Sequence, residues 1–178
     1  MPASHDDLIR RYAEGPALLR TALDKVPPQA LQWRPGPGKW SVHEVILHCA
    51  DSETNAHMRI RYLVGEADPL IVGYDQDIWA KAFDYHALPL EPAMATIEAV
   101  RANTVPLLRT LPESAWQKKG RHTEHPEYGV AKWMDIYAEH LEVHVRQIER
   151  NMSEWGRVAK GEAGVRQSGG RVNQIGSE

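Results

Sequence analysis

The sequence predicts an all-α protein, a four-helix bundle with two long connections. Four segments repeat their apolar residues at the spacing of an amphipathic helix, whereas strand-like alternation is scarce. Hydrophobic residues make up 42% of the 178-residue chain, which is enough for one sizeable core. The two connections, residues 66–90 and 112–130, are too long for the simplest bundle with short loops.

The first helix is expected over residues 6–26, where apolar side chains recur on one face. Pro16 lies inside it and is expected to kink it, because proline removes a backbone donor and clashes with the preceding turn. The segment that follows, up to Gly38, is rich in proline and glycine. It predicts an irregular packed loop, anchored by Trp33 and Trp40.

The second helix is expected to begin after Ser41 and to run to about Val64, with Gly65 as its stop. Ser41 and Glu44 have the spacing of a capping box, in which side chain and backbone satisfy each other's hydrogen bonds. Residues 66–90 are expected to be irregular, but they are rich in aromatic side chains. A long loop of that composition is expected to pack against the bundle through Tyr74, Trp79, Phe83 and Tyr85.

The third helix is expected from about Pro92 to Leu111 and the fourth from about Ala131 to Asn151, with a short hairpin between them. Residues 1–152 then form one helical domain. Residues 153–178 are poor in apolar bulk and hold six of the 13 glycines, so they are expected to form a mobile or weakly docked tail.

Composition excludes several classes of function. The net charge is −3, which argues against wholesale nucleic-acid binding. No apolar run is long enough to span a membrane, and the first residues lack a signal pattern. The single cysteine, Cys49, cannot form an internal disulfide, so we expect a cytoplasmic protein.

The chain contains nine histidines but only that one cysteine, and two of the histidines form a pair on the fourth predicted helix. At about 100° per residue, His140 and His144 lie roughly 20° to either side of Trp133, in the middle of the apolar stripe. Four residues apart, they stack on one face. Buried imidazoles need partners. A divalent metal ion would satisfy both, and hydrogen bonds to water, carboxylates or carbonyls are the alternative.

A third ligand would have to come from the second helix, which offers three histidines. Helical phase does not choose among His43, His48 and His57, although it slightly favours His57 by angle.

Two segments resemble the DinB superfamily. Residues 40–53, WSVHEVILHCADSE, are similar to the family signature of Trp-Ser/Thr, a Glu-Val or Gln-Val pair, a histidine four residues on and an aspartate three residues later. Residues 140–144, HLEVH, resemble the family's carboxyl-terminal His-x3-His. The likeness is to the YfiT-like branch and covers roughly residues 5–152.

The resemblance implies a four-helix bundle that holds one divalent ion, zinc or nickel, through His48, His140 and His144. It implies no role for His43 or His57, which are expected at the surface or at an edge of the apolar stripe. By the same resemblance the protein is expected to act on a small molecule and to form a homodimer. No nucleic-acid or membrane partner is expected, because of the net charge and the absence of a long apolar run.

Three imidazoles leave a coordination position open, as in catalytic metal sites. The open position does not decide the reaction, and the resemblance implies both a hydrolase that uses metal-activated water, which is the first reading, and the thiol chemistry that follows. One alternative is transfer of a low-molecular-weight thiol, of the bacillithiol, mycothiol or glutathione type, to an electrophile. Another is a non-catalytic, stress-related metal-binding module. Glu44 and Asp51, each about one turn from His48, are candidate catalytic or orienting carboxylates, with capping as the favoured role of Glu44.

Overall fold

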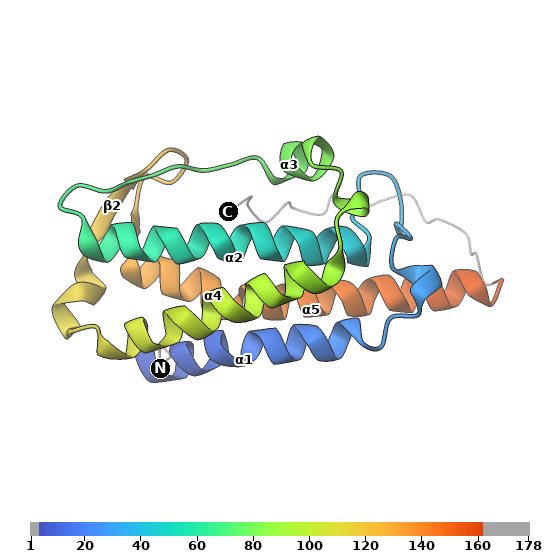
Figure 1. The fold of residues 1–178 in the computed structure, drawn as a ribbon, viewed down its shortest axis with the longest axis horizontal. Coiled ribbons are helices and arrows are strands. Elements are labelled where there is room, and N and C mark those ends of the chain that lie inside the picture. Colours follow the sequence, from blue (N-terminus) through green and yellow to red (C-terminus); the bar gives the residue numbers. More distant parts are fainter. Residues whose placement is uncertain (1–3, 162–178) are drawn as a thin grey trace, which may run out of the picture.

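The structure is a computed structural model that describes residues 4–161. Its four long helices lie along one another in a bundle, which confirms the predicted fold (Figure 1). They are α1 (His5–Leu23), α2 (Val42–Gly65), α4 (Leu90–Thr110) and α5 (Val130–Ala159).

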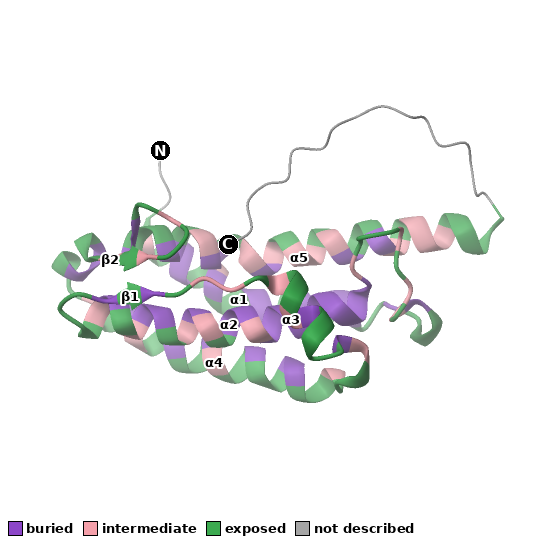
Figure 2. Ribbon diagram, turned by 90° about the horizontal axis from the view of Figure 1, so that it is seen from above, coloured by how far each residue is buried: buried purple, intermediate pink, exposed green. Residues whose placement is uncertain are grey.

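Each long helix packs against two others. Helices α1 and α2 both contact α4 and α5, so the core lies between all four. The buried residues line the inner faces of these helices (Figure 2). One apolar cluster centres on Val45, Ile46 and Met94, and a second centres on Ile60 and Trp133 further along the bundle. The metal-binding candidates therefore sit on helices whose positions are fixed along their whole length.

The start of α2 forms as the sequence predicts. Ser41 Oγ accepts a hydrogen bond from the Glu44 amide, and the Glu44 carboxylate accepts one from the Ser41 amide at 2.9 Å. This capping box satisfies backbone donors that a helix start leaves free. Helix α1 continues through Pro16 to Leu23, so the proline does not interrupt it.

The connection after α2 is more regular than expected. It contains the strand β1 (Leu70–Ile71) and the short helix α3 (Gln76–Ala82), so the prediction of a wholly irregular segment is wrong. The Asp75 carboxylate caps α3 by accepting hydrogen bonds from the backbone amides of Asp77 and Ile78, both at 2.9 Å. A capping carboxylate of this kind stabilises even a two-turn helix.

The predicted hairpin before the last helix is confirmed. Strand β2 (Lys119–His122) pairs antiparallel with β3 (Tyr128–Gly129), and β1 adds to β2 in parallel. This small sheet ties the two long connections together at one end of the bundle. Three short 3-10 helices complete the fold at Pro28–Ala30, Tyr85–Ala87 and Glu113–Gln117.

Helix α5 extends eight residues further toward the carboxyl terminus than predicted, since it ends at Ala159 and not at Asn151. The Trp155 ring packs edge-on against Trp33 with ring centroids 5.5 Å apart, and it joins the edge of the core. This packing stabilises the last turns of α5, although glycine becomes frequent in the sequence after Trp155. Residues 153–159 are thus helical, while the remainder of the predicted tail, 162–178, lies outside the described residues. None of the described helices combines the length and apolarity that a membrane crossing requires.

Candidate metal centre

Three histidines from two helices come together where α2 and α5 lie side by side. The ring of His48 lies 5.6 Å from that of His140 and 4.9 Å from that of His144, centroid to centroid, and the last two are 4.7 Å apart. One nitrogen from each ring lies within 4.8 Å of the others. His57, which helical phase slightly favoured, lies elsewhere, with its Nδ1 2.9 Å from Thr104 Oγ1.

The hydrogen bonds of the α5 pair fix where the protons are. His140 Nδ1 lies 2.9 Å from Glu53 Oε1, and His144 Nδ1 lies 2.9 Å from Gln147 Oε1. Both oxygens only accept hydrogen bonds, so both Nδ1 atoms carry hydrogen. Burial and the neighbouring His140 lower the pKa of His144 to about 3, so this ring is neutral and its Nε2 is a bare lone pair.

That lone pair faces the Nε2 of His140 at 3.2 Å. The contact needs a positive centre, supplied by a proton or by a metal ion. His48 is 3% exposed, and its Nδ1 is buried without a hydrogen-bond partner. Burial and the two other histidines hold the pKa of His48 well below its usual value, so it too is neutral. Three imidazoles, one with an unsatisfied nitrogen, suit a divalent ion such as zinc, nickel, iron or copper.

A buried ion pair supports the centre from behind. Glu53 on α2 is fully buried, and its carboxylate accepts hydrogen bonds from Arg101 Nε at 2.8 Å and Nη2 at 2.6 Å as well as from His140. Burial alone would raise the pKa of Glu53, but the Arg101 guanidinium and the His140 hydrogen bond bring it to about 2. The carboxylate is therefore ionised, and it orients His140 in the way that carboxylates orient metal-bound histidines in other proteins.

Sequence reasoning missed both members of this pair, although a signal was present. Counted at about 100° per residue, Glu53 lies roughly 20° from Val42, and Arg101 lies roughly 20° from Met94. Each charged residue thus sits in the middle of an apolar stripe, as the two histidines of α5 do.

The two carboxylates that the sequence proposed have other contacts. Glu44 caps α2 and forms an ion pair with Arg34. Asp51 accepts a hydrogen bond from the Tyr85 hydroxyl, and its half-buried position raises its pKa. Neither has a described contact with His48, so the carboxylate that the structure places against the three histidines is Glu53.

Two other expectations have different outcomes. His43 is 8% exposed, and its Nε2 lies 2.8 Å from the Leu88 carbonyl oxygen, so it is buried and does not lie at the surface. It holds the connection of residues 66–90 against α2. Cys49 is fully buried, and burial raises the pKa of its thiol well above the usual value, which fits an unreactive side chain.

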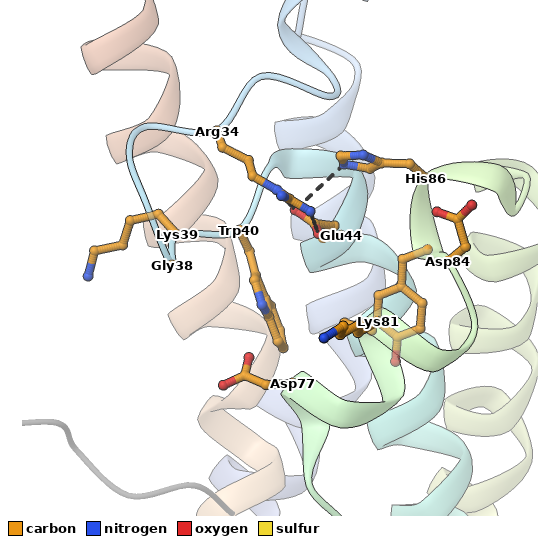
Figure 3. A pocket seen from close by; sticks show the side chains of 11 residues that line it. Arg34, Gly38, Lys39, Trp40, Glu44, Asp77, Lys81, Asp84 and His86 are labelled. Carbon is orange, nitrogen blue, oxygen red and sulfur yellow. Dashed lines mark hydrogen bonds and ion pairs between the residues drawn. The ribbon is translucent and has the colours of Figure 1, made fainter.

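Two open cavities adjoin the centre through side chains that contact its histidines. The Trp40 ring packs on His48 with centroids 4.9 Å apart and lines a cavity of about 540 Å³ (Figure 3). Trp40 extends there between the Glu44 ion pair and Asp77. Gln147, the partner of His144, lines a second cavity of about 470 Å³ on the other side of Trp40. None of the three histidines lines either cavity.

Comparison with known proteins agrees with this fold. The sequence profile of the DinB superfamily matches residues 11–148. A "Putative metal-dependent hydrolase" of Oceanobacillus iheyensis is 32% identical over 143 residues, which are 80% of this chain and 83% of that protein. The "Putative metal-dependent hydrolase YfiT" of Bacillus subtilis is 25% identical over 154 residues, 83% of this chain and 85% of that protein.

The solved structure of YfiT has the same fold, with a TM-score of 0.80 at 24% identity over 87% of this chain and 91% of that one. Its title describes a probable metal-dependent hydrolase with an unusual four-helix bundle topology.

Proposed function

This chain belongs to the DinB superfamily, and from that premise we propose that it is a divalent-metal-dependent hydrolase of a small molecule. One observation carries the proposal. His140 and His144 turn their Nε2 atoms toward each other at 3.2 Å, while both Nδ1 atoms are occupied by oxygen acceptors. Two partly buried imidazoles in that arrangement are oriented as ligands, and the third is the buried His48.

The chain's own groups keep the ligands ready. Glu53 and Gln147 hold the Nδ1 protons, so the lone pairs of Nε2 point inward. Burial keeps His48 and His144 neutral at pH 7, so neither of these two rings is a cation that would repel the ion. A divalent ion with an open coordination position supplies a Lewis acid, which polarises a carbonyl group and lowers the pKa of water.

The surroundings support a small substrate. The cavity beside Trp40 has a volume of about 540 Å³, within the range of ligand pockets, and its walls combine Trp40 with the charged groups of Lys81 and Asp77 (Figure 3). Trp40 covers His48, so a molecule held there is one side chain away from the centre.

The test combines metal content with turnover. Purified protein is expected to hold about one equivalent of zinc or nickel, and His140→Ala is expected to lose it, while the matched control His57→Ala retains it. Hydrolysis of a panel of esters and amides should disappear with the metal and return when it is added back. Full metal content in His140→Ala would contradict the three-histidine site.

The same assay distinguishes the hydrolase from the two alternative functions, a thiol transferase and a metal-binding module. Turnover that requires a low-molecular-weight thiol and an electrophile, without any hydrolysis, would replace the hydrolase with a thiol transferase. Bound metal with no turnover in either panel would favour a binding module.

A further inference from the structure

A second buried guanidinium lies in the bundle, and it has no carboxylate partner. Arg59 on α2 is 5% exposed, and it donates from Nη1 to the Tyr137 hydroxyl at 3.1 Å and from Nη2 to the Val72 carbonyl oxygen at 2.9 Å. Its Nε is buried without a hydrogen-bond partner. Within residues 4–161, no Asp or Glu oxygen lies within 4.0 Å of this guanidinium, and the groups that interact with its charge are tyrosines.

Comparison with Arg101 shows that Arg59 lacks a counter-charge. It is buried to the same degree, at 1% exposed, but Glu53 neutralises it through two hydrogen bonds. A buried charge without a counter-charge is costly, and proteins keep one where a ligand supplies the opposite charge. The neutral oxygens of Tyr137 and Val72 satisfy two donors of Arg59 but supply no negative charge.

Two ring nitrogens without partners lie in the β2–β3 hairpin, where the charge of Arg59 acts on His122. In the β2–β3 hairpin, His122 Nδ1 accepts the backbone amides of Glu124 at 3.0 Å and His125 at 3.3 Å. The neutral His122 ring must then carry its proton on Nε2, which makes that atom a donor. This Nε2 and the Nε2 of His125 are both buried without partners. The charge of Arg59 reaches His122 and, after burial, contributes most to the lowered pKa of that ring.

The same histidines are poorly arranged for a cation. Ligand atoms of His122, Glu124 and His125 lie within 4.8 Å of one another, which is close enough for a metal ion. Binding through His122 Nε2 would move the proton to Nδ1, where two amide hydrogens already point. The exposed Glu124 carboxylate lies against Gly73 and forms no ion pair with Arg59. The unpartnered donors are Arg59 Nε and His122 Nε2, and Arg59 adds a positive charge, so the cluster suits an acceptor.

We propose that Arg59, with His122 and His125, forms a subsite for an oxyanion, the carboxylate or phosphate group of a small molecule. Tyr137 links this subsite to the metal centre, since its hydroxyl accepts from Arg59 while its ring lies 5.6 Å from the ring of His140. Assigning the anion to the substrate rests on the proposed hydrolase function, whereas anion binding itself does not.

The test observes Arg59 directly in the full-length, metal-loaded protein. The Nε–H cross-peak of Arg59 in a ¹⁵N–¹H spectrum is followed while sodium acetate or inorganic phosphate replaces chloride at constant ionic strength. A saturable shift of this cross-peak is expected with at least one anion, together with a higher melting temperature. Tighter binding of acetate would identify a carboxylate site, and tighter binding of phosphate a phosphate site.

Variants give the control. Charge-assisted hydrogen bonds supply most of the affinity for such an anion. Arg59→Gln is therefore expected to lower the apparent anion affinity, measured from the rise in melting temperature, at least tenfold. Arg61→Gln removes the same charge from α2, where Arg61 contacts His57 and Asn103. This control variant should change the apparent anion affinity less than twofold. Arg59→Lys keeps the charge and serves if Arg59→Gln does not fold.

Three results would overturn the subsite: no saturable response to either anion, unchanged affinity in a folded Arg59 variant, or a second metal equivalent that depends on His122. Failure of the hydrolase proposal looks different. Metal-free His140→Ala would then still show the Arg59 response, although neither it nor the wild-type protein hydrolyses any ester.

Discussion

Glu53→Gln tests whether the buried carboxylate serves the metal centre or only neutralises Arg101. The substitution keeps the shape of the side chain but removes its charge. Glu53 and Arg101 are 0% and 1% exposed, so the variant leaves a guanidinium buried without a counter-charge. Breaking a buried pair in this way costs about 3–5 kcal/mol, a large part of the roughly 5–15 kcal/mol that stabilises a domain.

The effect on the metal is separate and smaller. Glu53 accepts the Nδ1 proton of His140 at 2.9 Å, and an amide oxygen accepts more weakly than an ionised carboxylate. Loss of such an orienting partner typically lowers metal affinity about 10–100-fold, or about 1.4–2.7 kcal/mol. Urea denaturation of the metal-free protein measures the first effect, and competition with a chromophoric chelator measures the second.

Two further variants make the result decisive. In Glu53→Gln/Arg101→Met no charge is left unpaired, so most of the stability should return while metal affinity stays low. Glu142→Gln removes a carboxylate from the partly exposed pair with Arg11 and should cost about 1 kcal/mol or less without affecting the metal. Metal affinity within twofold of wild type in Glu53→Gln would refute the orienting role and leave Glu53 as the partner of Arg101 alone.

Two more predictions follow from the same contacts. His144 has a pKa of about 3 when folded and about 6.5 when unfolded, and His48 shifts in the same direction, so only the unfolded chain binds these protons between those pH values. Below pH 6.5 the free energy of unfolding of the metal-free protein should therefore fall, by up to about 1.4 kcal/mol per pH unit for each of the two histidines. A free energy of unfolding from urea denaturation that stays constant from pH 7 to pH 5 would contradict this. Trp155→Ala removes the partly buried contact with Trp33 and should lower the free energy of unfolding by about 2 kcal/mol. It should also expose residues 153–159 to proteolysis. Unchanged protease resistance would mean that the ring does not hold the end of α5.

The sequence predicts most of the bundle because periodicity and capping are local. The capping box at Ser41 and the phase of His140 and His144 need only neighbouring residues, and both agree with the structure. The choice of His48 over His57 needed the family resemblance. Both histidines lie near the apolar stripe of α2, and which one meets α5 depends on the relative height of two helices that no local pattern encodes.

The parts that were missed depend on distant contacts or on charge. Helix α5 continues to Ala159 because Trp155 meets Trp33, which lies more than a hundred residues earlier in the chain. Glu53 and Arg101 were visible as charged residues in apolar stripes, but each alone suggests an unfavourable burial. Their meaning appears only when α2 and α4 pack and the two charges meet.

The buried charges together favour a negatively charged ligand. Glu53 and Arg101 cancel, Glu44 is paired with Arg34, and the imidazoles of His48 and His144 are neutral. Among the buried side chains of residues 4–161, this leaves the charge of Arg59 uncompensated. With a divalent ion held by the three histidines, the interior would gain two further positive charges and no negative one. An anionic group on the substrate would offset part of this excess, so substrate panels for this protein should include carboxylate- and phosphate-bearing esters beside neutral ones.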